Sequence, residues 1–203
     1  MTSPAGSGTA SGPLTEKIAE DHQEMYEYYD EYKNAKGNRD AQERWARLLI
    51  WEIARHAVGE ELVVYPLMEE HLGEEGKKLA DDDRADHQFV KEQLYAIESL
   101  TPGTQDYDAK LEAVMAHLHQ HNDSEEIKDL PLLEPAIGVE ASKIAAASFK
   151  RTKKFVPTRT HPSIPDHPPL ETIAGFLAAP IDKLKDMFSI FPTDEMKQEA
   201  KSS

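Results

Sequence analysis

Two stretches of the sequence follow one pattern: HAVGEELVVYP at residues 56–66 and HNDSEEIKDLP at residues 121–131. Each begins with a histidine, has two adjacent glutamates one helical turn later, and ends at a proline. A second matching pair, DHQ at residues 21–23 and DHQ at residues 86–88, precedes them. The spacing from His22 to His56 equals the spacing from His87 to His121, so the chain repeats itself at a constant interval. Such a repeat indicates two copies of one structural unit.

The segments around this repeat have apolar residues at helical spacing and predict four long helices. The first is expected over 15–36, the second from residue 40, the third from the acidic run 81–83 to residue 101, and the fourth over 105–127. Acidic residues favour a helix N-terminus, which is why the third helix is placed there. Pro66 is expected to end or kink the second helix, with Gly73 closing that segment, and Pro131 to end the fourth.

Helix length places the four histidines of the repeat at one level. The run from His22 to the end of the first helix is nearly as long as the run from the start of the second helix to His56. At a rise of about 1.5 Å per residue these lengths are about 21 Å and about 24 Å, so an antiparallel hairpin brings the two histidines together. The same lengths recur for His87 and His121. Two such hairpins predict an all-α, up-down-up-down four-helix bundle with the histidines in one core layer.

Two carboxylates belong to the same layer, because Glu60 and Glu125 each follow a histidine by one helical turn on one helix face. Buried carboxylates are costly when they are unpaired, and metal coordination removes that cost. Mixed imidazole and carboxylate ligands suit iron, manganese or zinc, and the chain has no cysteine to add a thiolate. Two carboxylates between two pairs of histidines can bridge two metal ions, and a non-haem di-iron centre is the leading interpretation.

The repeated H-x-x-x-E-E pattern, with an Asp-His helix before each copy, resembles the hemerythrin family and its HHE cation-binding relatives over about residues 14–135. The resemblance implies a hemerythrin-like bundle that holds two non-haem iron ions. The metal ligands that it implies are His22, His56, Glu60, His87, His121 and Glu125, with Glu126 as the alternative to Glu125. It also implies a small ligand, either a diatomic gas or peroxide.

The chain departs from respiratory hemerythrins at one ligand position. Those proteins carry a pair H-x-x-x-H on the third helix, and here the earlier member of that pair is Asp83. Either Asp83 supplies an oxygen ligand, or His117, one turn before His121, supplies a fifth nitrogen. Two classes of function therefore stay open. One is a protein that binds or senses oxygen, nitric oxide or iron, and the other is a di-iron enzyme that acts on oxygen or peroxide.

Several polar and aromatic residues beside the expected ligands receive lesser roles. Glu52 is expected to hydrogen-bond a ligand histidine, and Tyr29 to line the ligand pocket. Glu61 and Glu126 are expected to be solvated or to cap a helix. His119 is expected to face away from the centre and to be exposed.

The ends of the chain differ in composition from the bundle. Residues 1–13 predict a disordered tail, and residues 136–203 predict a C-terminal helical extension. The extension is expected to contain a short helix, a proline-rich linker at 156–169 and an amphipathic helix at 170–188. The basic cluster KRTKKF at 150–155 is expected to pair with the chain's own acidic surface.

Overall composition narrows the classes of partner and location. The formal net charge of −15 repels nucleic acid phosphates and anionic lipid, so neither is an expected partner. The N-terminus lacks the basic and apolar regions of a signal peptide, and no apolar run is long enough for a membrane span. The sequence predicts a soluble, cytoplasmic protein.

Overall fold

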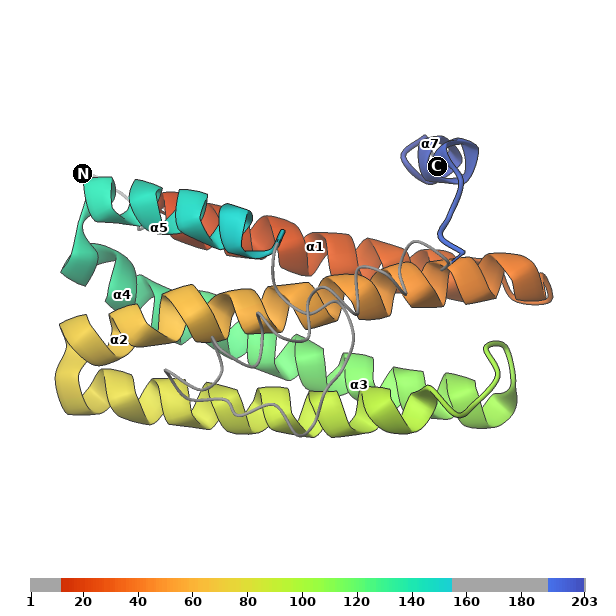
Figure 1. Ribbon diagram of the computed structural model, residues 1–203, viewed down its shortest axis with the longest axis horizontal. Coiled ribbons are helices and arrows are strands. Elements are labelled where there is room, and N and C mark those ends of the chain that lie inside the picture. Colours follow the sequence, from red (N-terminus) through yellow and green to blue (C-terminus); the bar gives the residue numbers. More distant parts are fainter. Residues whose placement is uncertain (1–11, 155–189, 203) are drawn as a thin grey trace, which may run out of the picture.

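The computed structural model describes residues 12–154 and 190–202, and all regular structure in these ranges is helical. The main body is an antiparallel bundle formed by α1 (Pro13–Asn34), α2 (Arg39–Ile97) and α3 (Gln105–Ser124) (Figure 1). α2 supplies two of the four arms, because the chain reverses direction at Gly73, where φ is 59° and ψ is −134°. The predicted all-α four-helix bundle is confirmed.

The turn between the two arms of α2 depends on glycine. The positive φ of Gly73 is disfavoured for residues with a side chain. At Gly76 an added Cβ would lie 1.9 Å from the Met68 carbonyl oxygen, so only glycine lets the two arms approach so closely. The second arm is helical from residue 74, and the acidic run 81–83 therefore lies inside it. The prediction that this run begins the third helix is wrong, because the glycine turn starts the helix earlier.

The two prolines of the repeat do not end their helices. α2 continues past Pro66 to the turn at Gly73, because Tyr65 and Met68 on either side are fully buried and hold the helix in the core. α3 continues through a π-helical segment, η1 (Glu125–Asp129), into α4 (Leu130–Ile137). The wider π turn lies directly before Pro131, whose ring would otherwise meet the carbonyl group one turn back. Gly138, with φ 76°, ends this continuous helical run.

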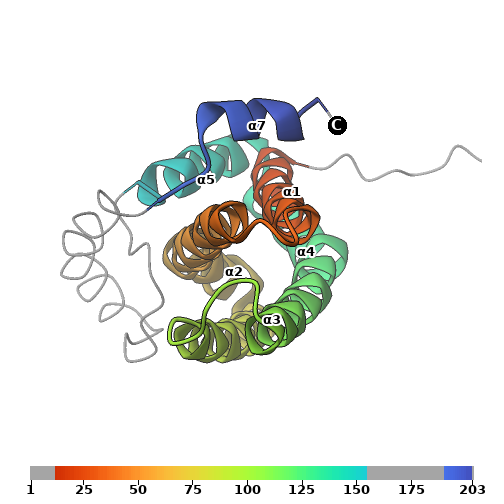
Figure 2. The same ribbon diagram turned by 90° about the vertical axis from the view of Figure 1, so that its right-hand side faces the viewer.

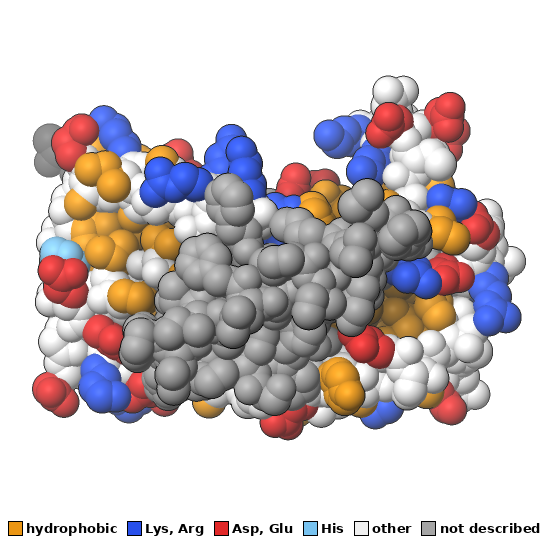
Figure 3. Space-filling model, viewed as in Figure 1, with side chains coloured by type: hydrophobic (Ala, Val, Ile, Leu, Met, Phe, Trp, Pro, Cys, Tyr) orange, Lys and Arg blue, Asp and Glu red, His pale blue; other side chains and the backbone are white. Residues whose placement is uncertain are grey.

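After Gly138 the chain turns back as α5 (Val139–Thr152), which lies outside the bundle against α1 and α2 (Figure 2). Phe149 of α5 is fully buried and packs on Gly59, where an added Cβ would lie 2.9 Å from the phenyl ring. The short helix expected after the bundle is therefore present. On the face in Figure 3, lysine and arginine side chains gather along the edge that α5 forms.

A second piece of the extension is α7 (Asp194–Ala200), which follows a segment anchored on α2. Arg44 donates a hydrogen bond to the Phe191 carbonyl oxygen at 3.0 Å, and the Phe191 ring meets Trp51 edge-on. The expected tail at 1–13, except for its last two residues, the proline-rich linker and the amphipathic helix at 170–188 lie outside the described residues. None of the described helices combines the length and hydropathy that crossing a bilayer requires.

Candidate metal centre

A layer of polar side chains crosses the bundle between two apolar clusters. One cluster, which includes Leu49, Leu94 and Leu111, lies toward the loops that join α1 to α2 and α2 to α3. The other includes Ile18 and Leu130 and lies toward the Gly73 turn. The layer consists of the six residues that the sequence nominates as ligands, all of them buried: His22, His56, Glu60, His87, His121 and Glu125.

The four histidines form two pairs whose Nε2 atoms face each other. His22 Nε2 lies 3.0 Å from His56 Nε2, and His87 Nε2 lies 3.1 Å from His121 Nε2. The Glu60 carboxylate stands between the pairs: Oε1 is 2.9 Å from His56 Nε2, and Oε2 is 3.4 Å from His87 Nε2. We refer to the pairs as the His22–His56 and the His87–His121 half-sites. The structure thus joins the two copies of the repeat through one glutamate.

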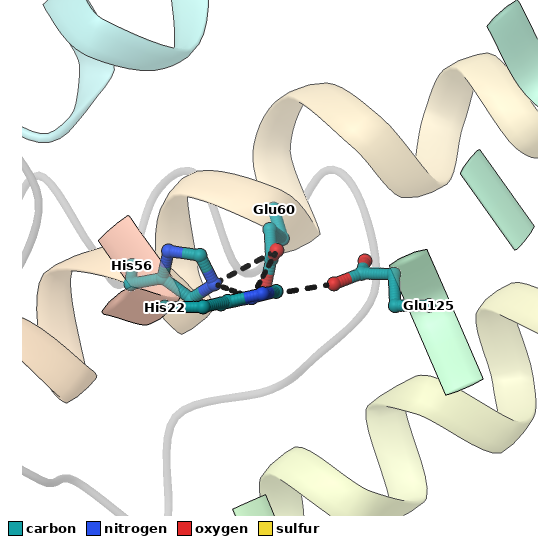
Figure 4. A group of neighbouring side chains, drawn as sticks. All are labelled: His22, His56, Glu60 and Glu125. Carbon is teal, nitrogen blue, oxygen red and sulfur yellow. Dashed lines mark hydrogen bonds and ion pairs between the residues drawn. The ribbon is translucent and has the colours of Figure 1, made fainter. Parts of the chain in front are cut away.

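Glu125 completes the His22–His56 half-site, as Figure 4 shows. It is the first residue of the π-helical segment, it is fully buried, and its Oε2 lies 3.6 Å from His22 Nε2. π turns inside α-helices occur frequently at functional sites, since they re-aim the side chains beside them. Glu126 lies outside the layer, on the far side of the His22 ring. Between the two glutamates that the sequence offers, the geometry favours Glu125.

The donor atoms of this layer fit a pair of metal ions. Both glutamates are fully buried: neither oxygen of Glu125 has a hydrogen-bond partner, and the oxygens of Glu60 face the Nε2 atoms of His56 and His87. Buried carboxylates placed in this way are costly unless a cation meets them. Within each half-site the potential donor atoms lie within 4.8 Å of one another, and Glu60 belongs to both groups. Imidazole nitrogens with carboxylate oxygens suit iron, manganese or zinc.

A carboxylate stands behind each of the four histidine rings, on the Nδ1 side. The four contacts, from Nδ1 to the nearest oxygen of that carboxylate, are His22 to Glu126 at 2.7 Å, His56 to Asp21 at 3.4 Å, His87 to Glu61 at 3.3 Å and His121 to Asp86 at 3.6 Å. At His22, His56 and His87 this carboxylate lies within hydrogen-bond distance, and such an acceptor holds the proton on Nδ1 and leaves Nε2 free to bind a metal. At His121 the oxygens of Asp86 and Asp83 both lie 3.6 Å from Nδ1, which is too long for a hydrogen bond. The repeat therefore encodes more than ligands. The aspartate of each DHQ lies behind the histidine of the H-x-x-x-E-E pattern in the same copy of the repeat. The second glutamate of each EE pair lies behind the DHQ histidine of the other copy.

These four carboxylates are of two kinds. Asp21 and Glu61 are buried, and each is held by a buried lysine: Lys153 bonds Asp21, and Lys91 bonds Glu61 at 3.1 Å. Glu126 and Asp86 reach solvent, with 37% and 42% of their side chains exposed. Each half-site thus has one histidine backed by a carboxylate that a lysine clamps, and one backed by an open carboxylate.

The pKa shifts of the four histidines follow this division into lysine-bound and open carboxylates. Burial alone would lower the pKa of His56, but Glu60 and Asp21 outweigh burial and raise it. At His87 burial would likewise lower the pKa, but the carboxylates of Glu60 and Glu61 raise it to about 9. For the other two rings burial dominates, and the pKa of His22 and of His121 is lowered.

The two central glutamates shift in opposite directions. Burial would raise the pKa of Glu60, but the rings of His56 and His87 overcome it and hold the pKa well below its ordinary value. Burial and the neighbouring carboxylates of Glu60 and Asp83 raise the pKa of Glu125 well above its ordinary value. Metal ions entering this layer would displace protons from the clamped histidines and from Glu125, so metal affinity should fall as pH falls.

Several expectations for the neighbouring residues are corrected. Glu61 is buried and backs His87, so it is neither solvated nor a cap. Glu126 is partly solvated, as expected, but it also backs His22. The repetition of both glutamates in the sequence was the signal for this role. Glu52 does not reach a ligand histidine, because Lys153 lies between Glu52 and Asp21. His119 is exposed, as expected.

The structure places the two alternatives for a further ligand, His117 and Asp83, outside the groups of converging donor atoms. His117 Nε2 bonds Asp86 at 3.0 Å, so His117 supports a backing carboxylate and does not enter the layer. Asp83 is buried beside the His87–His121 half-site but belongs to neither group of converging donor atoms, and its Oδ1 lies 3.6 Å from His121 Nδ1. Burial, followed by the repulsion of Asp129, raises the pKa of Asp83 to about 8.

Tyr65, and not the expected Tyr29, is the tyrosine that lies beside the His87–His121 half-site. The Tyr65 side chain is fully buried, and its hydroxyl lies 3.1 Å from His87 Nε2. Tyr29 instead lines a surface cavity of about 260 Å³ near the end of α1. Tyr65 follows Glu61 by one helical turn, so the face on which it lies could have been read from the sequence.

Comparison with known proteins agrees with the site. The family model of the hemerythrin HHE cation binding domain matches residues 14–133. A curated hemerythrin-like protein of Schizosaccharomyces pombe is 47% identical over 179 residues, which cover 88% of each of the two chains. No solved structure matches significantly. The chain belongs to the hemerythrin HHE cation-binding family, and the resemblance recognised from the repeat is confirmed.

Proposed function

We propose that this chain holds two non-haem iron ions and uses them to bind or sense a small ligand, oxygen or nitric oxide, or to sense iron itself. One observation carries the proposal: two histidine pairs share Glu60, whose two buried oxygens face one Nε2 atom of each pair. The residues that would hold the metals are His22, His56, Glu60, Glu125, His87 and His121. When bound, a pair of irons would supply the electrons that a dioxygen-class ligand takes up.

The protein's own contribution is orientation and exclusion of water. Backing carboxylates hold the proton on Nδ1 of His22, His56 and His87, which leaves the Nε2 atoms of these rings free to bind metal. Apolar clusters lie on both sides of the layer and include the fully buried residues Ile18, Leu49 and Leu94. A dry, charged layer of this kind favours a small ligand without apolar bulk.

Elemental analysis tests the metal directly. Protein expressed with ample iron should contain close to two irons per chain. Absorption spectra recorded under nitrogen and then under oxygen should differ, because the ligand would change the iron environment. One zinc per chain with no iron after the same expression would contradict the di-iron proposal.

A second candidate function is an oxidoreductase that consumes peroxide. The observation that favours it is the Tyr65 hydroxyl, which lies within 3.3 Å of both His87 ring nitrogens, with Asp83 nearby. These two groups could deliver protons to an oxygen-bearing ligand in the His87–His121 half-site. Peroxide consumption that exceeds that of free iron, and that falls at least about tenfold in Tyr65→Phe, would favour this candidate over a binding protein.

A further inference from the structure

We propose that Lys153 is a positioning residue of the metal centre: it holds Asp21 against His56, so that the C-terminal extension forms a working part of the His22–His56 half-site. The inference rests on the proposed metal site. Lys153 follows α5 and lies beyond residues 14–133, which the family model matches. The six nominated ligands all lie within that range, so this contribution comes from outside the family domain.

Lys153 is placed to act on His56 through one intermediate. Its side chain is buried, and Nζ donates hydrogen bonds to Asp21 Oδ2 and to Glu52 Oε1. The same oxygen, Asp21 Oδ2, faces His56 Nδ1 at 3.4 Å. Lys17 holds the other oxygen, Oδ1, at 2.9 Å from a half-exposed position on α1. The Asp21 carboxylate is therefore fixed in the orientation that its acceptor role requires.

The position of Lys153 is itself fixed by the docking of α5. At the start of α5 the buried Ser142 hydroxyl accepts a hydrogen bond from the Leu14 backbone N–H at 3.0 Å. At its end the Phe149 ring packs on Gly59 and meets the His56 ring edge-on at 5.6 Å between centroids. Both contacts are in the core, so α5 is held at two points with Lys153 directly after its last turn.

Lys153, and not a metal ion, offsets the charge of the acidic cluster in which its ammonium group lies. Asp21, Glu24 and Glu52 lie close enough together to suggest a cation site. The Lys153 ammonium is hydrogen-bonded to two of the three, Asp21 and Glu52, and is thus the cation of this group. Its charge offsets two buried carboxylates that would otherwise repel each other.

The other half-site shows what such a lysine does. Lys91 is buried and bonds Glu61 at 3.1 Å, and Glu61 lies 3.3 Å from His87 Nδ1. The chain of contacts from lysine to carboxylate to histidine is the same as that from Lys153 to Asp21 to His56. Lys91 lies in the second arm of α2, inside the bundle, whereas Lys153 comes from the extension. Two different positions in the sequence thus give the two half-sites equivalent support.

The test compares matched lysine variants of the full-length, iron-loaded protein. Lys153→Met and Lys91→Met remove the ammonium group of each buried lysine and keep an unbranched apolar side chain, while Lys154→Met changes the exposed neighbour and serves as control. Release of iron to an excess of chelator is followed under nitrogen. Loss of an outer hydrogen-bond partner weakens metal binding by about 10–100-fold. We expect each clamp variant to release one of its two irons faster by such a factor, and Lys154→Met to match the wild type.

Histidine variants assign the released metal to a half-site. In a His121→Ala background the remaining iron is held by His22 and His56, and Lys153→Met should accelerate its release. In a His56→Ala background Lys153→Met should have no effect. Lys153→Gln, which keeps a donor group on a shorter side chain, provides a variant that folds if Lys153→Met does not, and its release rate should be intermediate.

Three outcomes would overturn the inference while leaving the metal proposal intact. They are equal acceleration of both irons, no acceleration in Lys153→Met, and acceleration in the His56→Ala background. If the wild type takes up no metal, the proposed function fails, and solvent exchange of the His56 Nδ1–H in NMR spectra then decides. Faster exchange at His56 but not at His87 in Lys153→Met supports the positioning role, and unchanged exchange overturns it.

Discussion

The two half-sites contain the same kinds of ligand but differ in the residues around them. Positions that carry the chemistry recur at the interval of the repeat, as with His22 and His87 or Glu60 and Glu125. Positions next to the layer do not: Ile18 corresponds to Asp83, Leu130 to Tyr65, and Glu52 to His117. The His87–His121 half-site therefore has a buried carboxyl and a buried hydroxyl where the His22–His56 half-site has aliphatic side chains. Repetition preserved the metal ligands, and divergence beside them made two unequal environments.

The two half-sites also differ in the part of the chain that supplies their buried lysine. The His87–His121 half-site finds its buried lysine, Lys91, within the bundle, and the His22–His56 half-site takes Lys153 from beyond it. If Lys153 positions His56 as proposed, displacement of α5 would act first on the His22–His56 half-site.

Glu60→Gln should have the largest effect, because it removes the carboxylate that both half-sites share. A neutral amide cannot bridge two cations as a carboxylate does. Loss of an outer partner already costs about 10–100-fold in metal affinity, so loss of the bridge should exceed about 100-fold at both half-sites. Iron per chain, measured after gel filtration, should approach zero. Glu70→Gln, on the exposed face of α2, is the matched control and should keep the wild-type content.

His56→Ala and His121→Ala should each remove one metal and leave the other. Each variant should contain about half the iron of the wild type. A ligand present at about 100 times its Kd stabilises the folded state by about 2.7 kcal/mol, so losing one site should lower the melting temperature measurably. A His56→Ala protein that kept all its iron and its melting temperature would show that His56 is not a ligand.

Much of this arrangement could be predicted from the sequence because it depends on periodicity. Helical spacing and the repeat together indicate the bundle, the histidine layer and Glu60. The end of the segment at Gly73 was predicted correctly, but Pro66 and Pro131 do not end their helices. A proline inside a helix costs about 3 kcal/mol, which burial of neighbours such as Tyr65 outweighs. Only tertiary packing determines that outcome.

The contacts behind the ligands were harder to infer, since they join distant parts of the chain. Glu126 reaches back across 104 residues to His22, and Lys153 reaches across 132 residues to Asp21. The basic cluster at 150–155 was expected to pair with the chain's acidic surface, but its Lys153 pairs with the buried carboxylates of Asp21 and Glu52. Nothing in its sequence distinguishes the buried Lys153 from the exposed Lys154.

Asp21→Asn and Asp86→Asn compare the clamped carboxylate with the open one. Asp21→Asn leaves the Lys153 ammonium with only Glu52 in a buried position, and breaking a buried ion pair costs about 3–5 kcal/mol. Asp86 is 42% exposed, and exposed pairs contribute about 0–1 kcal/mol. Urea unfolding of the metal-free proteins should show the larger loss for Asp21→Asn. Equal losses would mean that Lys153 does not distinguish the two carboxylates.

The smallest effect concerns Asp83, which has no carboxyl counterpart in the other half-site because Ile18 occupies the equivalent position. Burial and Asp129 raise the pKa of Asp83 from 3.8 to about 8, so folding without metal favours the protonated carboxyl. A carboxyl group with a raised pKa stabilises the folded state least at high pH. Its contribution should be fully present below its unfolded pKa, near pH 4, and should be lost as pH rises to about 8.

Asp83→Asn should therefore flatten the pH dependence of the metal-free protein. The amide cannot ionise, so the variant should gain at least about 1 kcal/mol of unfolding free energy over the wild type between pH 5 and pH 8, which corresponds to less than one unit of the pKa difference. Asp82→Asn is the control, because Asp82 is exposed and pairs with Lys78 on the surface. Urea unfolding curves at several pH values measure the difference. Parallel curves for wild type and Asp83→Asn would show that Asp83 is ionised in the folded protein, and that the two half-sites are electrostatically more alike than their sequences indicate.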